Sequence, residues 1–532
     1  MAAVRQARRD SSRRATTAPV AVEPPRSLQS LFLPLALALA LGLLAFTSRV
    51  QQDPVLAGSF YGASLVLLLW SGALFWIITR DPRSLRSIEV VLRKQHYIQA
   101  AVQFSVYAYW GYYWRPVYDH ALLIVAQLLF AYAVDMLLTW SRREKYVLGF
   151  GAFPIVFSTN LFLWFKDDWF YLQFLMIAVG ILGKEFVRWQ RDGKSTHIFN
   201  PSAFTLGLFS VVLIATGTSD LTWGQQIAST LTLAPHIYVY LFAVGLIVMY
   251  FFSITLIAGT AAVVLFALSA LYSTVTGVPY FLDSEIPAAV FLGLHLLVTD
   301  PSTSPRMPLG KAIFGALYGL GVFVLYWLLT SIGAPTFYDK LLCVPLLNLS
   351  VKWIDRLAST LAEKVPSVPA ATSFNPLHMA AWAMIFIAMT AVGKTDGKHT
   401  GDSLPFWQQA CAEDRPHACE RLVLLETTYC KDNSAWACNE LGTHYREGKL
   451  VPADPQRAQQ QFAKACELRL QSGCVNLLHA DQTRHENPHE LDLRLLLREG
   501  GQNLMQMSNV DLYARACGHG WTFACEQTAT LR

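Results

Sequence analysis

Long apolar segments recur along most of this 532-residue chain and restrict it to one class of fold. Hydrophobic residues make up 53% of the sequence and charged residues only 15%, whereas soluble domains contain about 25% charged residues. A helix that crosses a bilayer needs about 20 mostly apolar residues. The sequence therefore predicts an all-α polytopic membrane bundle. About thirteen candidate spans follow from it, at 30–47, 56–78, 97–113, 119–140, 148–165, 168–187, 199–215, 234–252, 255–275, 286–299, 312–332, 337–352 and 377–393.

Lysine and arginine are concentrated in alternate loops between these spans. Because short basic loops stay on the cytoplasmic side, the alternation predicts a cytoplasmic N-terminus. An odd number of spans then places the chain after Lys394 on the outer side of the membrane, opposite the N-terminus. The net charge of +5, distributed in this way, does not indicate a nucleic-acid partner. The basic loops are 79–94, 141–145, 184–194, 306–311 and 352–364.

Eight of the nine cysteines fall into pairs with one spacing, C-x7-C. On a straight helix, cysteines eight positions apart would lie about 12 Å from each other, beyond the roughly 7 Å reach of a disulfide. Each bridge therefore requires a turn between two helices. Zinc is the alternative, but the usual C-x2-4-C spacing is missing. Because disulfides persist in the periplasm and not in the cytosol, the cysteines independently predict a periplasmic C-terminal domain. The predicted disulfides are Cys411–Cys419, Cys430–Cys438, Cys466–Cys474 and Cys517–Cys525.

Residues 405–527 also resemble the cysteine-rich tetratricopeptide-like repeats of Hcp type. The matching stretches are Ala437–Gly442, Ala465-Cys466 and Gly473–Leu477. The 36 residues from Cys430 to Cys466 are close to the period of two-helix solenoid repeats. The resemblance implies a disulfide-bridged α-solenoid, and solenoids present broad surfaces for protein partners.

A polar motif, His-Ile-Phe-Asn-Pro-Ser-Ala-Phe at 197–204, opens one of the spans on the cytoplasmic side. Asn200 is a favourable helix cap and Pro201 suits the first helical turn. Free amides at a helix start carry partial positive charge and can hold an anion or an electron-rich heterocycle. An ordinary capped span is the alternative.

A second polar motif, Thr-Asp-Pro-Ser-Thr-Ser-Pro at 299–305, lies at the inner end of the tenth span. The Asp300-Pro301 step ends a helix, and the hydroxyls that follow suit a turn or a ligand. Alone, this motif is only a rigid polar loop. His295 stands four to five residues earlier, a spacing that brings it toward the same pocket. A histidine bonded to a neighbouring carbonyl is the alternative, and Asn160 in the fifth span is equally ambiguous.

Together these motifs, within residues 95–360, resemble the family of two membrane-embedded electron-transport proteins. These are RnfD of the Rnf electron-transport complex and NqrB of the sodium-translocating NADH:quinone reductase, and stand-alone relatives include the UnbU-type proteins. The resemblance implies flavin-dependent electron transport in the bacterial inner membrane, coupled to ion movement, with other electron-transport subunits as partners. The ten central spans divide into two sets of five, so an inverted repeat is expected. The candidate cofactor-binding residues are Asn200, Pro201, His295, Thr299, Asp300, Ser302 and Thr303.

One departure from this family concerns the flavin. Members with covalent FMN attach it to the threonine of a Ser/Thr-Gly-Ala-Thr sequence, in the outer loop after the span that Asn200 begins. The corresponding loop here, 216–230, reads TGTSDLTWGQQIAST and contains no Gly-Ala-Thr. We therefore expect riboflavin or FMN bound without a covalent link, and no metal site.

The predicted organisation has five parts. A disordered basic N-terminus (1–28) precedes two extra spans with a basic loop (29–96), the ten-span core (97–356), a linker with the last span (357–404) and the periplasmic repeats (405–532). Two alternatives to electron transport remain open. One is a small-molecule or ion transporter without redox activity, and the other is a membrane scaffold for a periplasmic complex.

Overall fold

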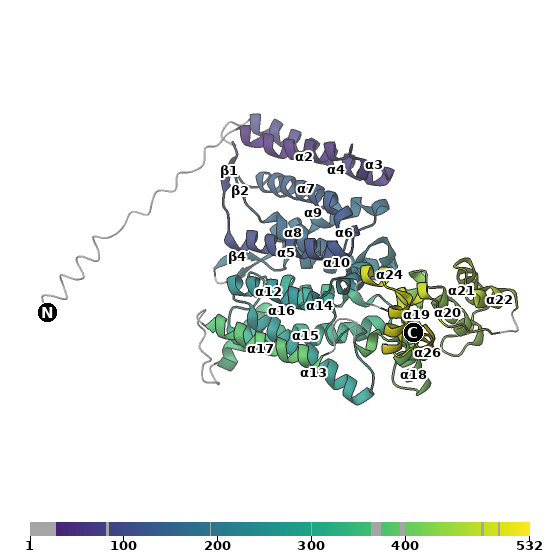
Figure 1. Cartoon of the computed structure of the whole chain (residues 1–532). Helices are drawn as coiled ribbons and strands as arrows, with labels where there is room; N and C mark the ends of the chain where they lie inside the picture. Colours follow the sequence, from purple (N-terminus) through teal and green to yellow (C-terminus); the bar gives the residue numbers. More distant parts are fainter. Residues whose placement is uncertain are drawn as a thin grey trace, which may run out of the picture.

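The computed structural model describes residues 28–80, 85–191, 193–282, 284–298, 300–362, 374–393, 399–479, 483–497 and 501–531. The predicted N-terminal segment 1–28 lies outside this description except for Leu28, and so do residues 363–373 and 394–398 of the predicted linker. Figure 1 shows a body of stacked helices joined to a smaller helical tail. We refer to residues 28–393 as the body and to 399–531 as the tail.

The body is built from helices that follow the predicted spans in order. The main helices are α2 (Phe32–Leu44), α4 (Pro54–Arg80), α5 (Lys94–Tyr113), α7 (Ala121–Trp140), α8 (Ala152–Asn160), α9 (Tyr171–Phe186), α10 (Pro201–Thr216), α12 (Ile237–Phe252), α13 (Thr255–Thr276), α14 (Ala288–Leu296), α15 (Pro308–Ser331), α16 (Asp339–Ala362) and α17 (Asn375–Val392). Short connecting helices are η1 (Leu28–Leu31), α3 (Ser48–Gln51), α6 (Pro116–Asp119), η3 (Asp167–Trp169), η4 (Ser219–Leu221), α11 (Gly224–Thr230), η5 (Leu231–Leu233) and η6 (Thr336–Tyr338).

Each of the thirteen candidate spans therefore contains a helix, but not every helix has the length of a span. Among the described residues, five helices are long and apolar enough to cross a membrane, or six if a pair bent by 102° counts as one span. These five are Pro54–Arg80, Pro116–Trp140, Thr255–Thr276, Pro308–Ser331 and Asn375–Val392. A helical protein with several apolar spans is thus confirmed, and the number thirteen stays a prediction.

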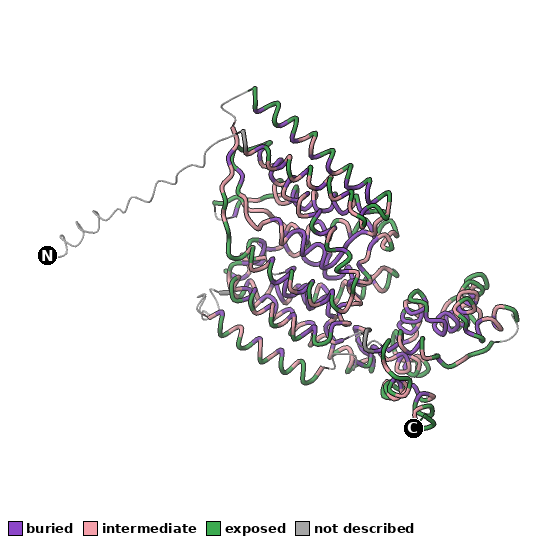
Figure 2. Tube along the Cα trace, turned by 45° about the horizontal axis from the view of Figure 1, so that its top comes forward, coloured by how far each residue is buried: buried purple, intermediate pink, exposed green. Residues whose placement is uncertain are grey.

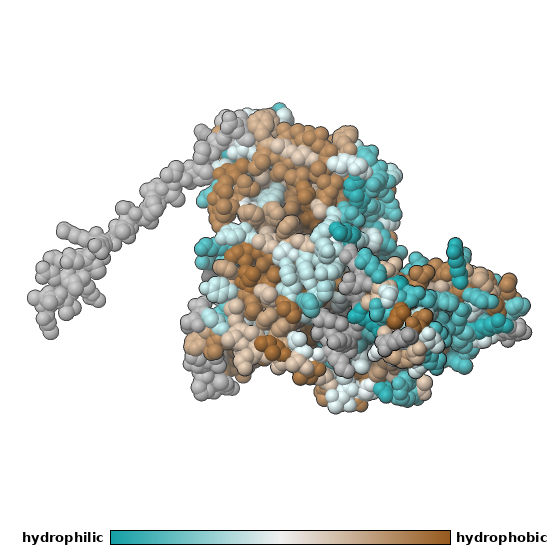
Figure 3. All heavy atoms as spheres, viewed as in Figure 1, coloured by the Kyte–Doolittle hydropathy of each residue, from teal (hydrophilic) through white to brown (hydrophobic). Residues whose placement is uncertain are grey.

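The surface of the body agrees with burial in lipid. Apolar residues cover much of the body in Figure 3, whereas hydrophilic residues gather on the tail. Exposed positions follow the outermost helices in Figure 2, and many of them are large apolar side chains. Phe46, Leu69, Met384 and Ile387 are each at least 65% exposed. Such a surface is unfavourable in water and suits a hydrocarbon solvent.

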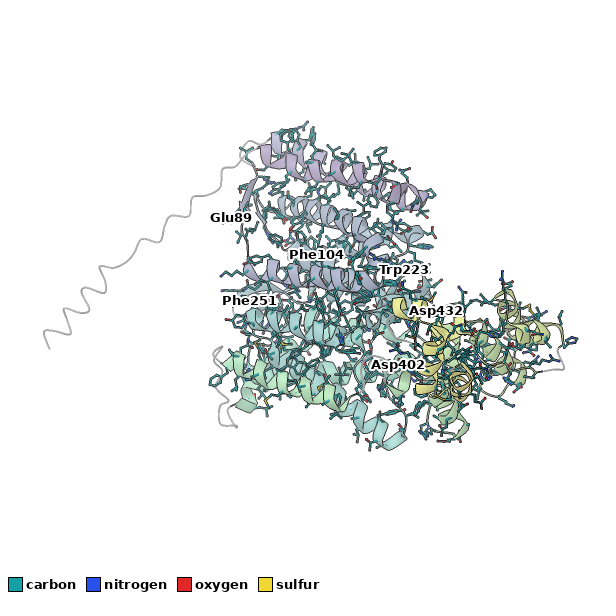
Figure 4. The ribbon with its side chains drawn as sticks, in the orientation of Figure 1. Glu89, Phe104, Trp223, Phe251, Asp402 and Asp432 are labelled. Carbon is teal, nitrogen blue, oxygen red and sulfur yellow. A yellow bond between two sulfur atoms is a disulfide. The ribbon has the colours of Figure 1, made fainter. Side chains whose placement is uncertain are left out.

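The predicted basic loops meet at one end of the body, which we call the basic end. Two of them pair as strands β1 (Ser87–Val90) and β2 (Lys145–Leu148), and a third forms the hairpin of β3 (Arg188–Arg191) and β4 (Lys194–His197). Ion pairs join these loops to their neighbours: Arg142 contacts Glu185, and Arg191 contacts Asp355 at 2.7 Å. In Figure 4, Glu89 and Phe251 mark this end.

The two small sheets are a departure from the all-α prediction. β1 pairs with β2 in parallel, and β3 pairs with β4 in antiparallel register. The paired segments contain branched or aromatic residues such as Ile88, Val90, Tyr146 and Val147, which favour extended backbone. Because the basic loops lie side by side, the backbone N–H and C=O groups of one segment can form hydrogen bonds with those of its neighbour.

The loops with few positive charges meet at the other end of the body, which we call the low-charge end. Arg49 forms an ion pair with Asp167 at 2.8 Å. Phe165 forms an antiparallel bridge with Thr222. Trp223 and Asp402 mark this end in Figure 4, next to the tail. The alternation of charge in the sequence therefore corresponds to two physically separate ends of the body.

The ten main helices from α5 to α16 fall into two sets with the same internal contacts. In the first set α8 packs on α5 and α7, and α9 packs on α7 and α10. In the second set α14 packs on α12 and α13, and α15 packs on α13 and α16. The third helix of each set, α8 or α14, has only 9 residues. The sets meet through α5 against α12 and through α10 against α16.

The tail consists of short helices joined by disulfides. All four predicted bridges are present, and each joins the end of one helix to the start of the next, with Cα–Cα distances of 4.5–4.7 Å. The residue before the second cysteine is small because the helices touch there: a Cβ on Gly473 would lie 2.6 Å from that of Ala465. The helices are η8 (Thr400–Asp402), α18 (Leu404–Ala412), α19 (Ala418–Lys431), α20 (Ala435–Glu447), α21 (Pro455–Glu467), α22 (Gln471–Leu478), α23 (Glu490–Leu496), α24 (Gly501–Gln506), α25 (Asn509–Gly518) and α26 (Thr522–Leu531).

The tail is docked on the low-charge end of the body. The Arg421 guanidinium donates to the Tyr326 hydroxyl at 3.1 Å and lies over its ring, 4.9 Å from the centroid. Arg415 donates to the Gly277 carbonyl at 2.9 Å. Val278 is 2% exposed and belongs to the apolar core of the tail. The tail and the basic loops therefore lie at opposite ends of the body.

A buried ion pair makes the stability of the tail depend on pH. His444 Nε2 lies 2.9 Å from the Glu426 carboxylate, and only 1% of the Glu426 side chain is exposed. Burial opposes protonation of His444, but the carboxylate outweighs it and raises the His444 pKa. Burial also raises the pKa of Glu426. Both shifts favour the protonated folded tail. The His444 contribution is fully present below its unfolded pKa of about 6.5 and is lost as the pH rises through its folded pKa, and the Glu426 contribution begins to be lost above its own unfolded pKa of about 4.5.

We therefore predict that raising the pH from about 6.5 to 9 lowers the free energy of unfolding of α19 and α20. Urea-dependent hydrogen exchange of these helices in the full-length protein measures this. The substitution Glu426→Gln should reduce the slope against pH, and the pair of His485 with Glu440, where the His485 pKa is also raised, should supply the remainder. An unchanged slope in the variant would contradict the assignment to Glu426 and His444.

Candidate functional site

The first polar motif forms a helix start held from two sides. The side-chain oxygen of Asn200 accepts from the backbone N–H groups of Ser202 and Ala203, at 3.0 and 3.3 Å, and so caps α10. The side-chain N–H group of Asn200 donates to the carbonyl of Leu297 at 3.0 Å, just past the end of α14. Pro201 occupies the first turn, as predicted. Asn200 thus joins the start of one helix to the end of another.

Asn348 of α16 completes this junction. Its side-chain oxygen accepts from the Asn200 backbone N–H at 3.1 Å, and its side-chain N–H donates to the Thr303 carbonyl at 3.0 Å. Asn348 is 1% exposed. One buried amide therefore contacts both polar motifs at once. Asn348 lies within the 95–360 stretch that carries the resemblance, but the sequence offered no reason to include it among the site residues.

The second polar motif is organised around the Asp300 carboxylate. It accepts from the backbone N–H and the hydroxyl of Ser302, at 2.9 and 2.6 Å, and from the hydroxyl of Thr303 at 3.2 Å. His197 Nε2 lies 2.9 Å from the Ser302 hydroxyl and 3.6 Å from the carboxylate. Burial opposes ionisation, but the bonds to His197 and Ser302 outweigh it and lower the Asp300 pKa. The two motifs thus meet through His197, Asp300 and Ser302.

Thr299 and His295 are two further candidate residues. Thr299 lies outside the described residues. His295 is 1% exposed within α14, and its Nδ1 bonds to the Phe291 carbonyl at 2.8 Å. Its ring packs so closely against Gly245 that a Cβ there would overlap it. The bond to the carbonyl corresponds to the alternative considered for His295, a histidine held by its own helix.

A clamp at the basic end supports the second motif. Arg191, 6% exposed, donates from one guanidinium nitrogen to the Ser304 carbonyl at 3.0 Å and from another to the Asp355 carboxylate at 2.7 Å. Asp355 also accepts from the Arg306 backbone N–H at 3.2 Å. Arg191 and Asp355 therefore hold three elements together: the β3–β4 hairpin, the 300–306 loop and α16.

Three polar groups beside this clamp are buried and form no hydrogen bond with any described residue. They are the hydroxyls of Thr196 and Ser304 and the indole N–H of Trp189. Trp189 and Thr196 are partners across the β3–β4 hairpin. Because buried polar groups in native proteins are nearly always bonded to protein, water or ligand, these three are the groups of the site that remain available to a bound molecule.

A second buried polar cluster lies toward the low-charge end. The Asn160 side chain exchanges hydrogen bonds with Gln127, at 2.6 and 3.1 Å, and its oxygen lies 3.2 Å from His120 Nε2. Gln173 donates to Gln127 at 3.1 Å. The His120 ring stacks on Trp164 at 4.1 Å. Sequence reasoning singled out Asn160 only; the glutamines stand far apart in the chain, so only the fold reveals the cluster.

Comparison of the chain with protein-family models, curated proteins and solved structures found no match. Among the described residues, no group of three or more His, Cys, Asp or Glu side chains is arranged to hold a metal ion. The interpretation of the site therefore rests on the geometry above.

The double role of Asn200 leads to a prediction. Asn200→Ala removes the helix cap and leaves the Leu297 carbonyl without its donor, so we expect a loss of about 1–3 kcal/mol in stability. Asn200→Asp keeps the capping oxygen but removes the donor, and it should also destabilise the protein. Unfolding by denaturing detergent measures both. Wild-type stability in Asn200→Asp would show that the cap alone matters.

Proposed function

We propose that this protein is an integral inner-membrane electron-transport subunit that binds a flavin without a covalent link. The observation that supports this most directly is the meeting of the two polar motifs at the basic end. Asn348 bonds to both motifs, and His197 of the first motif contacts Ser302 of the second. The motifs are some hundred residues apart in sequence. They are also the segments that resemble RnfD of the Rnf complex and NqrB of the sodium-translocating reductase.

The groups available at this site fit the polar edge of a flavin. Flavin rings carry both carbonyl oxygens and ring nitrogens, and Thr196, Ser304 and Trp189 offer hydroxyl and N–H groups that lack partners among the described residues. Asn200 and Asp300 are engaged within the protein, so we assign them to positioning the loops rather than to direct contact. A bound flavin would accept and release electrons one or two at a time. We propose the riboflavin or FMN form, with other electron-transport subunits as donors and acceptors.

The arrangement of the ten central helices supports an inverted repeat. The two sets have the same order of long and short helices and the same internal contacts. We propose that α5–α10 and α12–α16 are such repeats within a body of thirteen spans. Inverted repeats with short broken helices are common in membrane transport proteins.

This architecture also favours a second candidate function, a transporter without redox activity. The half-length helices α8 and α14 both end inside the apolar body, each next to a cluster of amide side chains. Broken helices of this kind form substrate and ion sites in transporters. A colourless preparation that takes up a solute in vesicles would favour this function.

We further propose that the basic end faces the cytoplasm, so that the tail lies in the periplasm and docks a protein partner. Two independent arguments favour this orientation. Basic loops stay on the cytoplasmic side of the membrane, and disulfides persist in the periplasm. A scaffold role for the tail is compatible with either function of the body.

The flavin proposal predicts a yellow protein. Purified full-length chain should show flavin absorbance, with fluorescence that increases on denaturation and no fluorescent band on a denaturing gel. Thr196→Val removes one of the available hydroxyls and should lower the flavin-to-protein ratio. Thr274→Val is the matched control, because that hydroxyl is exposed and bonds within its own helix. Folded but colourless wild-type protein would exclude the flavin.

The proposed orientation predicts the labelling of cysteines in intact spheroplasts. After reduction, a membrane-impermeant thiol reagent should modify Cys466 in the tail. A cysteine introduced by Glu89→Cys, at the basic end, should react only after the cells are opened, and Cys343, which is free and buried, should not react in either case. Labelling of the position-89 cysteine in intact spheroplasts would show that the basic end faces the periplasm, which contradicts the proposed orientation.

A further inference from the structure

A groove with a volume of about 440 Å³ lies between α13, α15 and α17. These helices are adjacent in Figure 1, and all three belong to the five that are long and apolar enough to cross a membrane. Val263, which lines the groove, is 40% exposed, so the groove opens on the apolar outer surface of these helices. Its volume is within the range of small-molecule pockets, about 300–1,000 Å³. Small and branched side chains form it, including Gly259, Val263, Ala316, Ala381 and Ile385.

The walls of the groove favour an apolar occupant. Of the threonines that line it, Thr260 donates to the Leu256 carbonyl at 2.5 Å and Thr255 donates to the side chain of Asn375 at 3.0 Å. Both hydroxyls are thus engaged by the protein. A polar ligand in the groove would lose its hydrogen bonds with water without replacing them. A hydrocarbon chain has no such cost.

One end of the groove is positively charged. The lining residues come from the first halves of α13, α15 and α17, so the three N-termini lie at the same end. Helix N-termini carry partial positive charge and attract anions. Lys311, next to the lining residue Ala312, is half-buried there and donates to the Ser253 carbonyl at 2.7 Å. His378 also lines the groove.

We propose that this groove binds one hydrocarbon chain of an anionic phospholipid, with the phosphate at the N-termini of α13, α15 and α17 beside Lys311. Basic pockets between membrane helices on the cytoplasmic side suit anionic headgroups. An uncharged headgroup would gain nothing from Lys311 or from the three helix N-termini. None of the residues that line the groove belongs to the proposed flavin site, and the proposal does not depend on a bound flavin.

The test uses purified full-length protein in detergent, mixed with phosphatidylglycerol or with phosphatidylcholine of identical chains, and native mass spectrometry of the bound lipid. We expect the protein to retain phosphatidylglycerol in preference to phosphatidylcholine. Lys311→Gln should reduce that preference about fivefold, and Lys311→Arg should restore it.

Gly259→Leu should abolish retention by filling the groove. A Cβ at this position meets only Trp382, at 3.7 Å, which is ordinary van der Waals contact, so the first carbon of the new side chain fits without moving the helices. Gly62→Leu in α4 is the matched control, because a Cβ there meets no atom within 4 Å, and it should leave retention unchanged. Equal binding of both lipids, retention in Gly259→Leu, or displacement of phosphatidylglycerol by an added quinone would each overturn the proposal.

Discussion

The exclusion of water from the interior of the body governs this structure, because a polar group placed there is costly unless it is bonded within the protein or to a bound molecule. Asn200 shows the consequence. Its side chain caps α10, holds the carbonyl of Leu297, and is linked through its backbone to Asn348. In an apolar surrounding each such bond lost leaves a donor or acceptor unsatisfied. The amides therefore fix how α10, α14 and α16 meet, and the loop that carries Asp300 is held by the same bonds. The candidate site is therefore formed by the same side chains that bond to the free backbone groups at these helix ends.

The same exclusion of water keeps most charged side chains of the body at its two ends. Among the described residues of the body, Arg191 and Lys340 are buried cations: Arg191 is compensated by Asp355 and the Ser304 carbonyl, and Lys340 by Asp339 at 3.1 Å. Most other lysines and arginines of the body gather at the basic end. The tail contacts the opposite end through Arg421 and Arg415, whose partners on the body are a tyrosine hydroxyl and a backbone carbonyl, and through His399, which lies 3.4 Å from the Glu285 carboxylate.

The sequence predicted the features that depend on short stretches of chain. Apolar length gave the positions of the thirteen helices, the Asn200-Pro201 step gave the start of α10, and the cysteine spacing gave all four disulfides. It did not give the strands, because pairing between β1 and β2 depends on two loops that are far apart in the chain. It also missed Asn348 and the Gln127–Gln173 pair, since an isolated amide in an apolar segment has no local signature. His295 shows the reverse: its spacing suggested the pocket, but the fold turns its ring toward Gly245.

The half-length helices α8 and α14 explain why polar clusters occur where they do. A helix that stops inside an apolar body leaves carbonyl groups that no following turn can satisfy. At the end of α14, Asn200 supplies a donor to Leu297; at the end of α8, the Asn160 side chain bonds to the Val156 carbonyl and is itself held by Gln127. Amides suit both places because each offers donors and an acceptor without charge. Since one helix ends toward the low-charge end and the other toward the basic end, two broken helices lead to two polar centres at different depths. That separation is what a protein needs if it is to move electrons or ions across an apolar layer in steps.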